Sequence, residues 1–301
     1  MKNNLRKTKS VTRDAVSQYL MLAPFFLIFF IFVIIPITSS VVLSFTSYDM
    51  LSSPKFLGLE NYRRMFIDDE VFMITLKNTM LFAFIIGPIG FILAFVLAWL
   101  INELGLKSRT LLSFLFYAPA LVGNGYLIWQ ILFSGDSYGY MNSLLLSMGV
   151  INEPIIWLSE ANYLMPIIIL IQLWQGMGTS FLANISGLQN VSSEIFEAGA
   201  IDGIHNRWQE LWYLTLPSMK HMLLFGAVMQ IQASFSIGAV AVAIAGYPSV
   251  EHSVDTIVSL MSDVGTVRYE LGYASAMSAV LFIMMFVSRM FVGKLFGNKG
   301  N

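Results

Sequence analysis

The chain alternates between long apolar runs and short polar segments. Six of the runs reach about 20 mostly apolar residues or more, the length at which a helix crosses a bilayer. Only helices satisfy their own backbone polar groups in lipid, so each run is predicted to be α-helical. The pattern predicts an all-α, polytopic membrane domain over residues 19–296, with six transmembrane helices at residues 19–45, 74–101, 111–133, 163–187, 222–245 and 271–296.

The first run follows a basic segment, residues 1–18, as a secretory signal would. Its apolar part is about 25 residues long, whereas the apolar region of a signal peptide has about 7–15. No A-x-A cleavage sequence follows it. We therefore predict an uncleaved helix.

The distribution of basic residues favours one orientation. With an even number of spans both termini share a side, and that side carries most of the basic residues: Lys2, Arg6, Lys7, Lys9, Arg13, Lys107, Arg109, Arg207, Lys220, Arg289, Lys294 and Lys299. The other side carries Lys55, Arg63, Arg64, Lys77 and Arg268. Because short cytoplasmic segments are enriched in Lys and Arg, both termini are predicted to be cytoplasmic, including the tail at residues 297–301. The segment 190–217 falls on the same side.

Composition narrows the function further. The chain is 56% hydrophobic and 12% charged, against about 25% charged residues in a soluble domain. A net charge of -1 gives no electrostatic support for binding nucleic acid. The absence of Cys excludes disulfides, thiolate metal sites and cysteine nucleophiles. The three His lack the spacing of metal ligands, so we predict that this chain binds no metal or cofactor.

One polar segment, EAGAIDGIHNRWQELWYLTLP at residues 197–217, has strong helix signals. Ser192 or Ser193 can cap a first helix, with Glu194 in its first turn. Gly203 suits the left-handed position that ends a helix. Asn206 is a good cap for a second helix, and Gln209 gives it a capping-box-like partner.

The second helix is predicted to be short and amphipathic. Trp208, Leu211, Trp212 and Thr215 share one face, and Leu216–Pro217 is expected to end the helix because the residue before Pro avoids the α region. The segment therefore predicts a rigid helix-turn-helix. It is either an interfacial loop that lies on its own protein or on the headgroups, or a docking element for a cytoplasmic partner.

The segment resembles the EAA loop of permeases in binding-protein-dependent ABC importers. That pattern has E-A-A, three residues, Gly, then about nine residues to an aliphatic-x-Leu-Pro. Here it reads Glu197-Ala198-Gly199, Gly203 and Leu214-Thr215-Leu216-Pro217. The third position is Gly rather than Ala, and the distance from Gly to Pro is one residue longer than in the commonest form.

Other stretches resemble the sugar permeases of the MalF/MalG-like group. They are PKFLGLENYRRMF at residues 54–66, WQGMGTSFLANISGLQNV at 174–191 and ELGYASAMSAVLF at 270–282. The likeness runs from about residue 20 to 290. It implies the fold of a type I ABC importer permease in a bacterial or archaeal cytoplasmic membrane.

The resemblance also implies partners. Such permeases work as pairs, so a second homologous permease subunit is expected, as a heterodimer. Two ABC ATPase subunits are expected at the cytoplasmic face, and an extracytoplasmic binding protein delivers the solute. The chain has no G-x-x-x-x-G-K-[ST] sequence, so ATP and Mg are expected on the ATPase subunits and no catalytic residue on this chain.

By the same resemblance, the loop around Glu197 couples the channel to the ATPase. Glu197 is expected to meet a basic group there, Ala198 and Gly199 to allow close approach, and Gly203 to make the turn. Trp208, Leu211 and Trp212 are expected to pack the element onto its own transmembrane core. The predicted coupling residues are Glu197, Ala198, Gly199, Asp202, Gly203, Ile204, His205 and Asn206.

Polar side chains within the spans are candidates for the solute path. Amides beside aromatic rings suit sugars, whose hydroxyls need donors and acceptors. Interhelical hydrogen bonds use the same residue types, and both interpretations stay open. The candidates are Asn124, Gln130, Gln175, Gln230, Gln232 and Ser236.

The sequence thus predicts the permease subunit of a carbohydrate importer. A close alternative is a permease for a polyol or a glycerol phosphodiester. An ion-coupled carrier would need a buried charge, and an intramembrane enzyme a nucleophile and base at bilayer depth; neither is evident.

Overall fold

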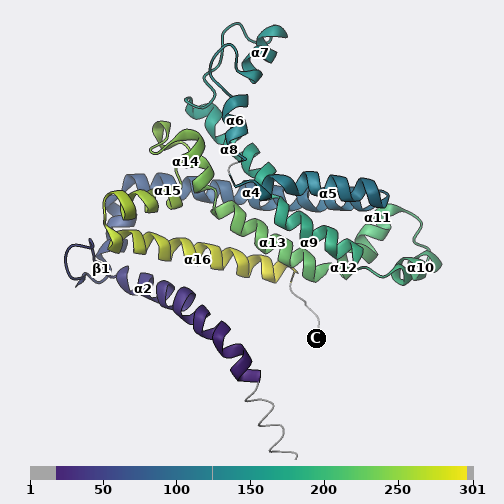
Figure 1. Ribbon diagram of the computed structural model, residues 1–301, viewed down its shortest axis with the longest axis horizontal. Coiled ribbons are helices and arrows are strands. Elements are labelled where there is room, and N and C mark those ends of the chain that lie inside the picture. Colours follow the sequence, from purple (N-terminus) through teal and green to yellow (C-terminus); the bar gives the residue numbers. More distant parts are fainter. Residues whose placement is uncertain (1–17, 124, 297–301) are drawn as a thin grey trace, which may run out of the picture. The chain divides into compact units, whose positions relative to one another are not determined.

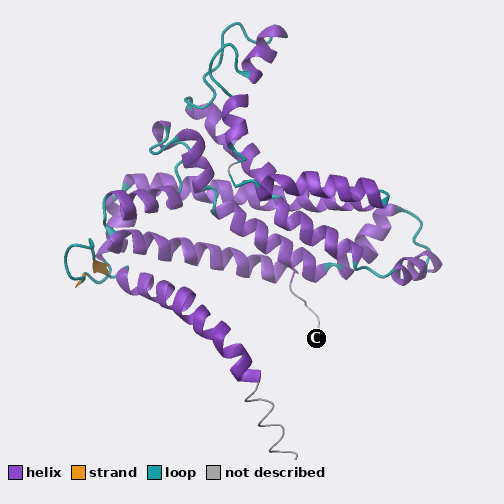
Figure 2. Ribbon diagram, in the orientation of Figure 1, coloured by secondary structure: helices purple, strands orange, loops and turns teal. Residues whose placement is uncertain are grey.

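The computed structural model describes residues 18–123 and 125–296. Helices dominate this part of the chain, and its one strand pair is a two-stranded hairpin (Figure 2). The elements are η1 (Phe30–Ile34), α2 (Ile35–Leu43), β1 (Thr46–Ser47), β2 (Lys55–Phe56), α3 (Glu60–Arg63), η2 (Arg64–Asp68), α4 (Glu70–Asn102), α5 (Leu106–Leu121), α6 (Leu127–Leu132), α7 (Tyr140–Ser147), α8 (Ala161–Gly176), α9 (Gly178–Gln189), α10 (Ser193–Ile201), α11 (Arg207–Gln209), η3 (Glu210–Thr215), α12 (Leu216–Ser218), α13 (Lys220–Phe235), α14 (Gly238–Ala245), η4 (Val250–His252), α15 (Ile257–Ser262), η5 (Asp263–Val267) and α16 (Leu271–Phe296).

The all-α prediction is confirmed, and five of the six predicted spans correspond to helices long and apolar enough to cross a membrane. Four are continuous within the described residues, at Gln18–Leu43, Glu70–Asn102, Lys220–Ala245 and Leu271–Phe296. The fifth is the pair α8 and α9, which is bent by 41°. Glycines flank this bend at Gly176 and Gly178, and Gly is a common cause of kinks.

The predicted span at 111–133 is not one helix. α5 begins earlier, at Leu106, and ends at Leu121, and α6 begins only at Leu127. Pro119 lies in the last turn of α5, with Gly123 and Gly125 beyond it. Each Gly costs a helix about 1 kcal/mol relative to Ala, so the apolar run does not continue as one helix. The prediction followed hydropathy and gave these breakers too little weight.

The chain divides into two compact units. The first comprises residues 18–63 of the described part together with Val264–Ala279. Its organising side chain is Asn61, whose Nδ2 donates to the carbonyls of Ser44 at 2.8 Å and Thr46 at 2.9 Å. The Tyr62 hydroxyl donates to Ser44 Oγ at 2.8 Å. These bonds fix the chain after the first span to α3 and give Asn61 and Tyr62, in the stretch 54–66, a structural role.

The second unit comprises Arg64–Asp263 and residues 280–296 of the described part. Helix α4 is its central element and packs closely on α9 and α13 (Figure 1). One half of α4, with Phe82 and Ile86, joins an apolar core with α8 and α14. The other half, with Ala94 to Ile101, joins a second core with α9 and the start of α13. The three helices thus form the packed core of this unit, to which the segment 190–217 is attached.

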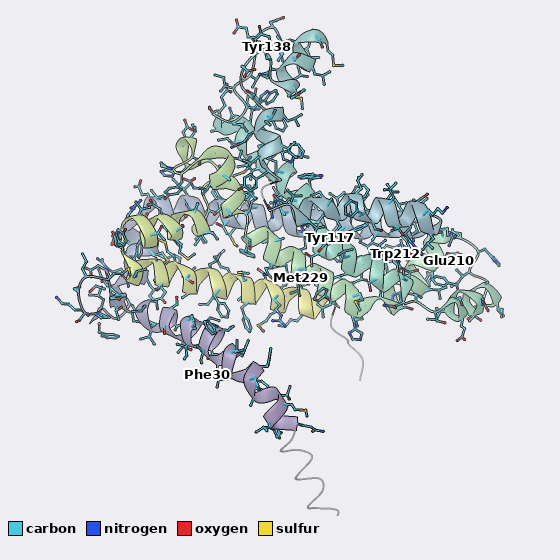
Figure 3. All side chains as sticks on the ribbon, in the orientation of Figure 1. Phe30, Tyr117, Tyr138, Glu210, Trp212 and Met229 are labelled. Carbon is cyan, nitrogen blue, oxygen red and sulfur yellow. The ribbon has the colours of Figure 1, made fainter. Side chains whose placement is uncertain are left out.

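A folded excursion between α6 and α8 belongs to the same unit and carries α7 (Figure 1). Its centre is Asn142, a fully buried amide. Nδ2 of Asn142 donates to the carbonyls of Ser134, Asp136 and Ile155, and Oδ1 accepts from Ile155 N–H and from Trp157 Nε1. One side chain therefore holds three stretches of this excursion together. Tyr138 at its tip is almost fully exposed (Figure 3).

Candidate functional site

The segment singled out in the sequence folds as two short helices joined by a tight turn. α10 begins after Ser192, whose Oγ accepts from Glu194 N–H at 3.3 Å. Beyond its last turn, Gly203 has a φ of +88°. Gly203 N–H donates to Ala200 O at 3.3 Å, and Ile204 N–H donates to Gly199 O at 2.9 Å. This pair of bonds is the Schellman motif, so the predicted glycine stop is confirmed in detail.

Gly199 acts inside the element rather than on its surface. It is buried, and a Cβ at this position would lie 2.6 Å from Leu214 Cδ1 and 3.4 Å from Ile204 Cδ1. The small residue lets α10 approach η3 closely. The expectation that Gly199 leaves room for a partner is therefore wrong; its missing side chain is replaced by Leu214 of the same chain.

The remaining predicted coupling residues lie on the outside of the turn. Their exposure leaves them open to a partner, apart from Ile204, which is half-buried against Gly199. The exposed ones are Glu197, Ala198, Asp202, Gly203, His205 and Asn206.

The second helix is capped as predicted. Asn206 Oδ1 accepts from Trp208 N–H at 2.7 Å and from Gln209 N–H at 3.2 Å. The reciprocal bond is displaced by one residue, because Gln209 Oε1 accepts from His205 N–H at 3.2 Å rather than from Asn206 N–H. The backbone donors are therefore satisfied at both ends of the turn, by backbone carbonyls in the Schellman motif and by the side chains of Asn206 and Gln209, which makes the turn stiff.

The sequence predicted that the second helix ends at Leu216–Pro217, but in the structure the helical segment continues past these residues. Residues Glu210–Thr215 form a π-helical turn, in which Leu216 N–H donates to Leu211 O. Pro217 then lies at the start of the short α12. A Pro ring clashes with the carbonyl four residues earlier in an α-helix, and the wider turn accommodates it. Pro217 thus redirects the helix toward α13 instead of stopping it.

The π-helical turn also changes which side chains face the core. Leu211 is buried, as predicted, among residues of α4, α9 and α13, and Thr215 is buried as well. Trp208 and Trp212 are 62% and 64% exposed, so the expectation that both pack on the transmembrane core is wrong. Trp208 contacts Trp99 of α4 with the two rings tilted, at a ring-centroid distance of 5.6 Å.

An ion-pair cluster that the sequence reasoning missed ties the turn to α4. Arg207 Nη2 lies 2.8 Å from Glu103 Oε2 at the end of α4, and Nη1 lies 2.9 Å from Glu210 Oε2. The hydrogen bond that Arg207 donates to Glu210, and then the charge of Glu103, raise the pKa of Arg207 above its ordinary value. Arg207 is 65% exposed, so each pair contributes less than about 1 kcal/mol. The two ion pairs mainly orient the turn relative to the end of α4. In the sequence, only the i, i+3 spacing of Arg207 and Glu210 could have indicated an ion pair.

Two of the six candidate path residues are engaged in interhelical hydrogen bonds. Gln130 Nε2 donates to Ala243 O at 2.8 Å. Gln230 is completely buried, and its Nε2 donates to Ile86 O of α4 at 3.4 Å. A Cβ at Gly90 would lie 2.1 Å from that nitrogen, so the Gln230 side chain occupies the space that the missing side chain of Gly90 leaves on α4. These contacts favour the structural interpretation for Gln130 and Gln230.

Three other candidates have different surroundings. Gln232 lies in the last turn of α13 and Ser236 is the residue that follows the helix; both are exposed, and Ser236 Oγ donates to Gln232 O at 2.9 Å. Gln175 is half-buried, and its Oε1 has no hydrogen-bond partner among the described residues. Asn124 lies outside the described residues, as do the basic residues of the segment 1–17 and the tail at 297–301. Gln232 and Ser236 thus lie on an exposed surface, whereas Gln230 is buried between α13 and α4.

Comparison with known proteins identifies the family. Residues 87–298 match the family model described as the binding-protein-dependent transport system inner membrane component. The chain is 31% identical to the probable ABC transporter permease protein YesP of Bacillus subtilis, over 93% of this chain and 90% of that protein. It is 32% identical to the lactose transport system permease protein LacF of Rhizobium radiobacter, over 71% of this chain and 70% of that protein.

A solved structure supports the fold. A chain of a bacterial ABC transporter involved in the import of the acidic polysaccharide alginate superposes with a TM-score of 0.79, covering 98% of this chain and 100% of that one at 20% identity. The family model covers most of the transmembrane domain, including the capped helix-turn-helix. The chain therefore belongs to the family of binding-protein-dependent transport system inner membrane components.

Proposed function

We propose that the chain is one of two membrane subunits of an ABC importer for carbohydrates, powered by separate ATPase subunits. An extracytoplasmic binding protein would deliver the solute, and a second, homologous permease would complete the channel. ATP and Mg would be bound by the ATPase subunits at the cytoplasmic face, where both termini of this chain would also lie. The family assignment and the named relatives support this proposal.

The observation that carries the coupling role is the stiffness of the turn around Gly203. Its backbone donors are bonded at both ends, by the Schellman motif and by Asn206. Glu197 and Asp202 remain exposed on the outside, and Leu211 anchors the other side in the core. A stiff element that is exposed on one side and anchored on the other transmits a rigid-body push to α4, α9 and α13, whereas a flexible loop would absorb it.

The carbohydrate class is supported by relatives and by chemistry. Lactose and arabinooligosaccharides appear in the names of relatives that are 32% and 28% identical to this chain. Gln232 offers both donors and acceptors on an exposed face of α13, as sugar hydroxyls require. Ser236 adds a hydroxyl one turn further along.

The test of the solute class is ATP hydrolysis by the reconstituted importer. The chain would be reconstituted with its second permease, ATPase subunits and binding protein, and supplied in turn with neutral oligosaccharides, polyols and glycerol phosphodiesters. We expect an oligosaccharide to stimulate hydrolysis. Stimulation only by a polyol or a glycerol phosphodiester would overturn the carbohydrate assignment while leaving the importer assignment intact.

Gln230 and Gln232 provide a matched pair for the solute path. We expect Gln230→Ala to lower the thermal stability of the permease, because it leaves a cavity between α4 and α13 and removes the hydrogen bond to Ile86 O, at a cost of about 2 kcal/mol. We expect Gln232→Ala to leave the unfolding temperature unchanged and to raise the solute concentration for half-maximal transport about tenfold, by losing about 1.4 kcal/mol of solute contact. Unfolding curves and transport titrations on both variants check this. A stability loss in Gln232→Ala together with a transport defect at unchanged stability in Gln230→Ala would contradict this prediction.

A further inference from the structure

We propose that three aromatic residues of the second helix, Trp208, Trp212 and Tyr213, lie in the headgroup region of the bilayer and hold the helix-turn-helix at the lipid–water boundary. We call these residues the aromatic face. The proposal rests on the family's membrane placement and adds a lipid contact to the proposed coupling role. It requires neither the carbohydrate assignment nor the ATPase contact to be correct.

The aromatic face is open and made of residue types suited to this region. Trp208, Trp212 and Tyr213 are 62%, 64% and 70% exposed. The chain has six Trp, all within the described residues, and the other four are at least partly buried. Three large aromatic rings in water would be unfavourable. Trp and Tyr concentrate at membrane interfaces because an apolar ring carries one polar atom.

The depth of the aromatic face follows from α4. This helix carries no Asp, Glu, Lys or Arg between Lys77 and Glu103, a length of about 38 Å at 1.5 Å per residue. The hydrocarbon core is about 30 Å thick, so Glu103 marks the level of the water. Trp99 lies one turn before Glu103, at the boundary, and its ring contacts that of Trp208. Trp208 therefore lies at the boundary too.

The reverse side of the second helix gives the same depth. Leu211 packs in a core that includes Ala98 and Ile101, in the last turns of α4. Trp212 follows Leu211 directly and points outward, as its 64% exposure shows. Arg207 at the start of the helix pairs with Glu103 on the water side. The helix thus has an ion pair in water and aromatic rings at the level of the lipid headgroups.

Lipid is a better occupant of this face than the ATPase. In Figure 1, α10 lies beyond the ends of α5 and α9, whereas α11 lies beside them. The exposed acids Glu197 and Asp202 belong to the distal part, where a partner in the water phase would bind. Leu100 in the last turn of α4 and Leu104 just after it are exposed as well, and the aromatic face meets α4 through the contact of Trp208 with Trp99. Figure 3 shows Trp212 on this part of the molecule.

An anchor at this position would keep the element from tilting out of the boundary. A push on α10 would then move the attached spans rather than rotate the turn. The aromatic face would act as a lipid-held pivot beside the ion pair of Arg207 and Glu103.

Because the chain has no Cys, single-cysteine variants test the proposal without background labelling. Tyr213→Cys and the exposed control Asp202→Cys would each carry an environment-sensitive fluorophore, with the permease pair in nanodiscs. Lipids bearing a nitroxide near the headgroup would quench from the bilayer, and iodide would quench from water. We expect lipid quenching at residue 213 to be several-fold stronger than at residue 202, with the reverse order for iodide.

Two results would overturn the proposal. The first is iodide quenching at residue 213 as strong as at residue 202, which would place the aromatic face in water. The second is loss of lipid quenching at residue 213 when ATPase subunits are added, which would make the face a protein interface. Because the lipid measurement needs neither solute nor ATP, its failure leaves the proposed function standing, and failure of transport leaves the lipid contact standing.

Discussion

Gly203→Pro is expected to reduce solute-stimulated ATP hydrolysis by about tenfold or more. Gly203 has a φ of +88°, which the Pro ring, fixed near about -65°, cannot adopt. The substitution also removes the N–H that donates to Ala200 O and so opens the Schellman motif. Space is not the cause, because a Cβ at Gly203 would meet no described heavy atom within 4 Å. A loss of activity would therefore report on the backbone conformation of the turn alone. The measurement is solute-stimulated ATP hydrolysis by the reconstituted importer.

Gly203→Asn is the matched control. Asn is the residue after Gly that most readily adopts a left-handed backbone, so this variant should retain most of the stimulated hydrolysis. The permease should unfold at nearly the same temperature in both variants, because Gly203 is exposed and outside the core. Wild-type hydrolysis by Gly203→Pro, or equal losses in both variants, would mean that the shape of the turn does not matter.

Gly272→Ala is expected to destabilise the first unit by about 3 kcal/mol, the upper part of the usual cost of overpacking. A Cβ at Gly272 would lie 2.1 Å from Thr46 O and 3.1 Å from Tyr48 N, both of which are backbone atoms. Backbone cannot turn aside as a flexible side chain can. The clash would also break the hydrogen bond from Gly272 N–H to Tyr48 O. The measurement is the thermal unfolding of the purified permease, with expression in the membrane as a second reading.

Gly293→Ala in the same helix controls for helix propensity. A Cβ at Gly293 would meet no described heavy atom within 4 Å, and Ala favours a helix over Gly by up to about 1 kcal/mol. This variant should therefore be neutral or slightly more stable. Equal unfolding temperatures for the two variants would show that the contact of Gly272 with β1 does not support the unit.

Local signals predicted the caps and the turn well. Ser192, Gly203 and Asn206 act as the sequence indicated, because each depends on bonds within a few residues. The apolar runs predicted five of the spans for a similar reason, since the bilayer acts on each run separately. The broken third span was also visible, in Pro119 and the two glycines beyond it, but was outweighed by hydropathy.

What the sequence could not show depends on contacts between distant residues. Whether Gln230 or Gln232 faces a neighbouring helix is set by the packing of α13 on α4, and both residues look alike in the sequence. Gly199 looked like a surface residue because Leu214, which fills its space, follows only after the turn. Helical spacing placed Trp212 on one face with Leu211, but the π-helical turn at Glu210–Thr215 changes that spacing, and only Leu211 is buried.

The pair formed by Arg207 and Glu103 illustrates the same limit. The two residues are far apart in the sequence and meet only because Leu211 seats the second helix at the end of α4. In the sequence, Arg207 could be counted among the basic residues that set the membrane orientation, but its partner could not be identified. Tertiary contacts of this kind become visible only once the elements are assembled.

We propose that a separate ATPase acts on this channel through the helix-turn-helix around Glu197. The most direct measurement is thiol labelling of Glu197→Cys in a chain that has no other cysteine. A membrane-impermeant reagent would be applied to right-side-out and inside-out vesicles, with and without the ATPase subunits. We expect labelling only in inside-out vesicles and strong protection when the ATPase is bound. Labelling from the outside, or labelling unchanged by the ATPase, would contradict it.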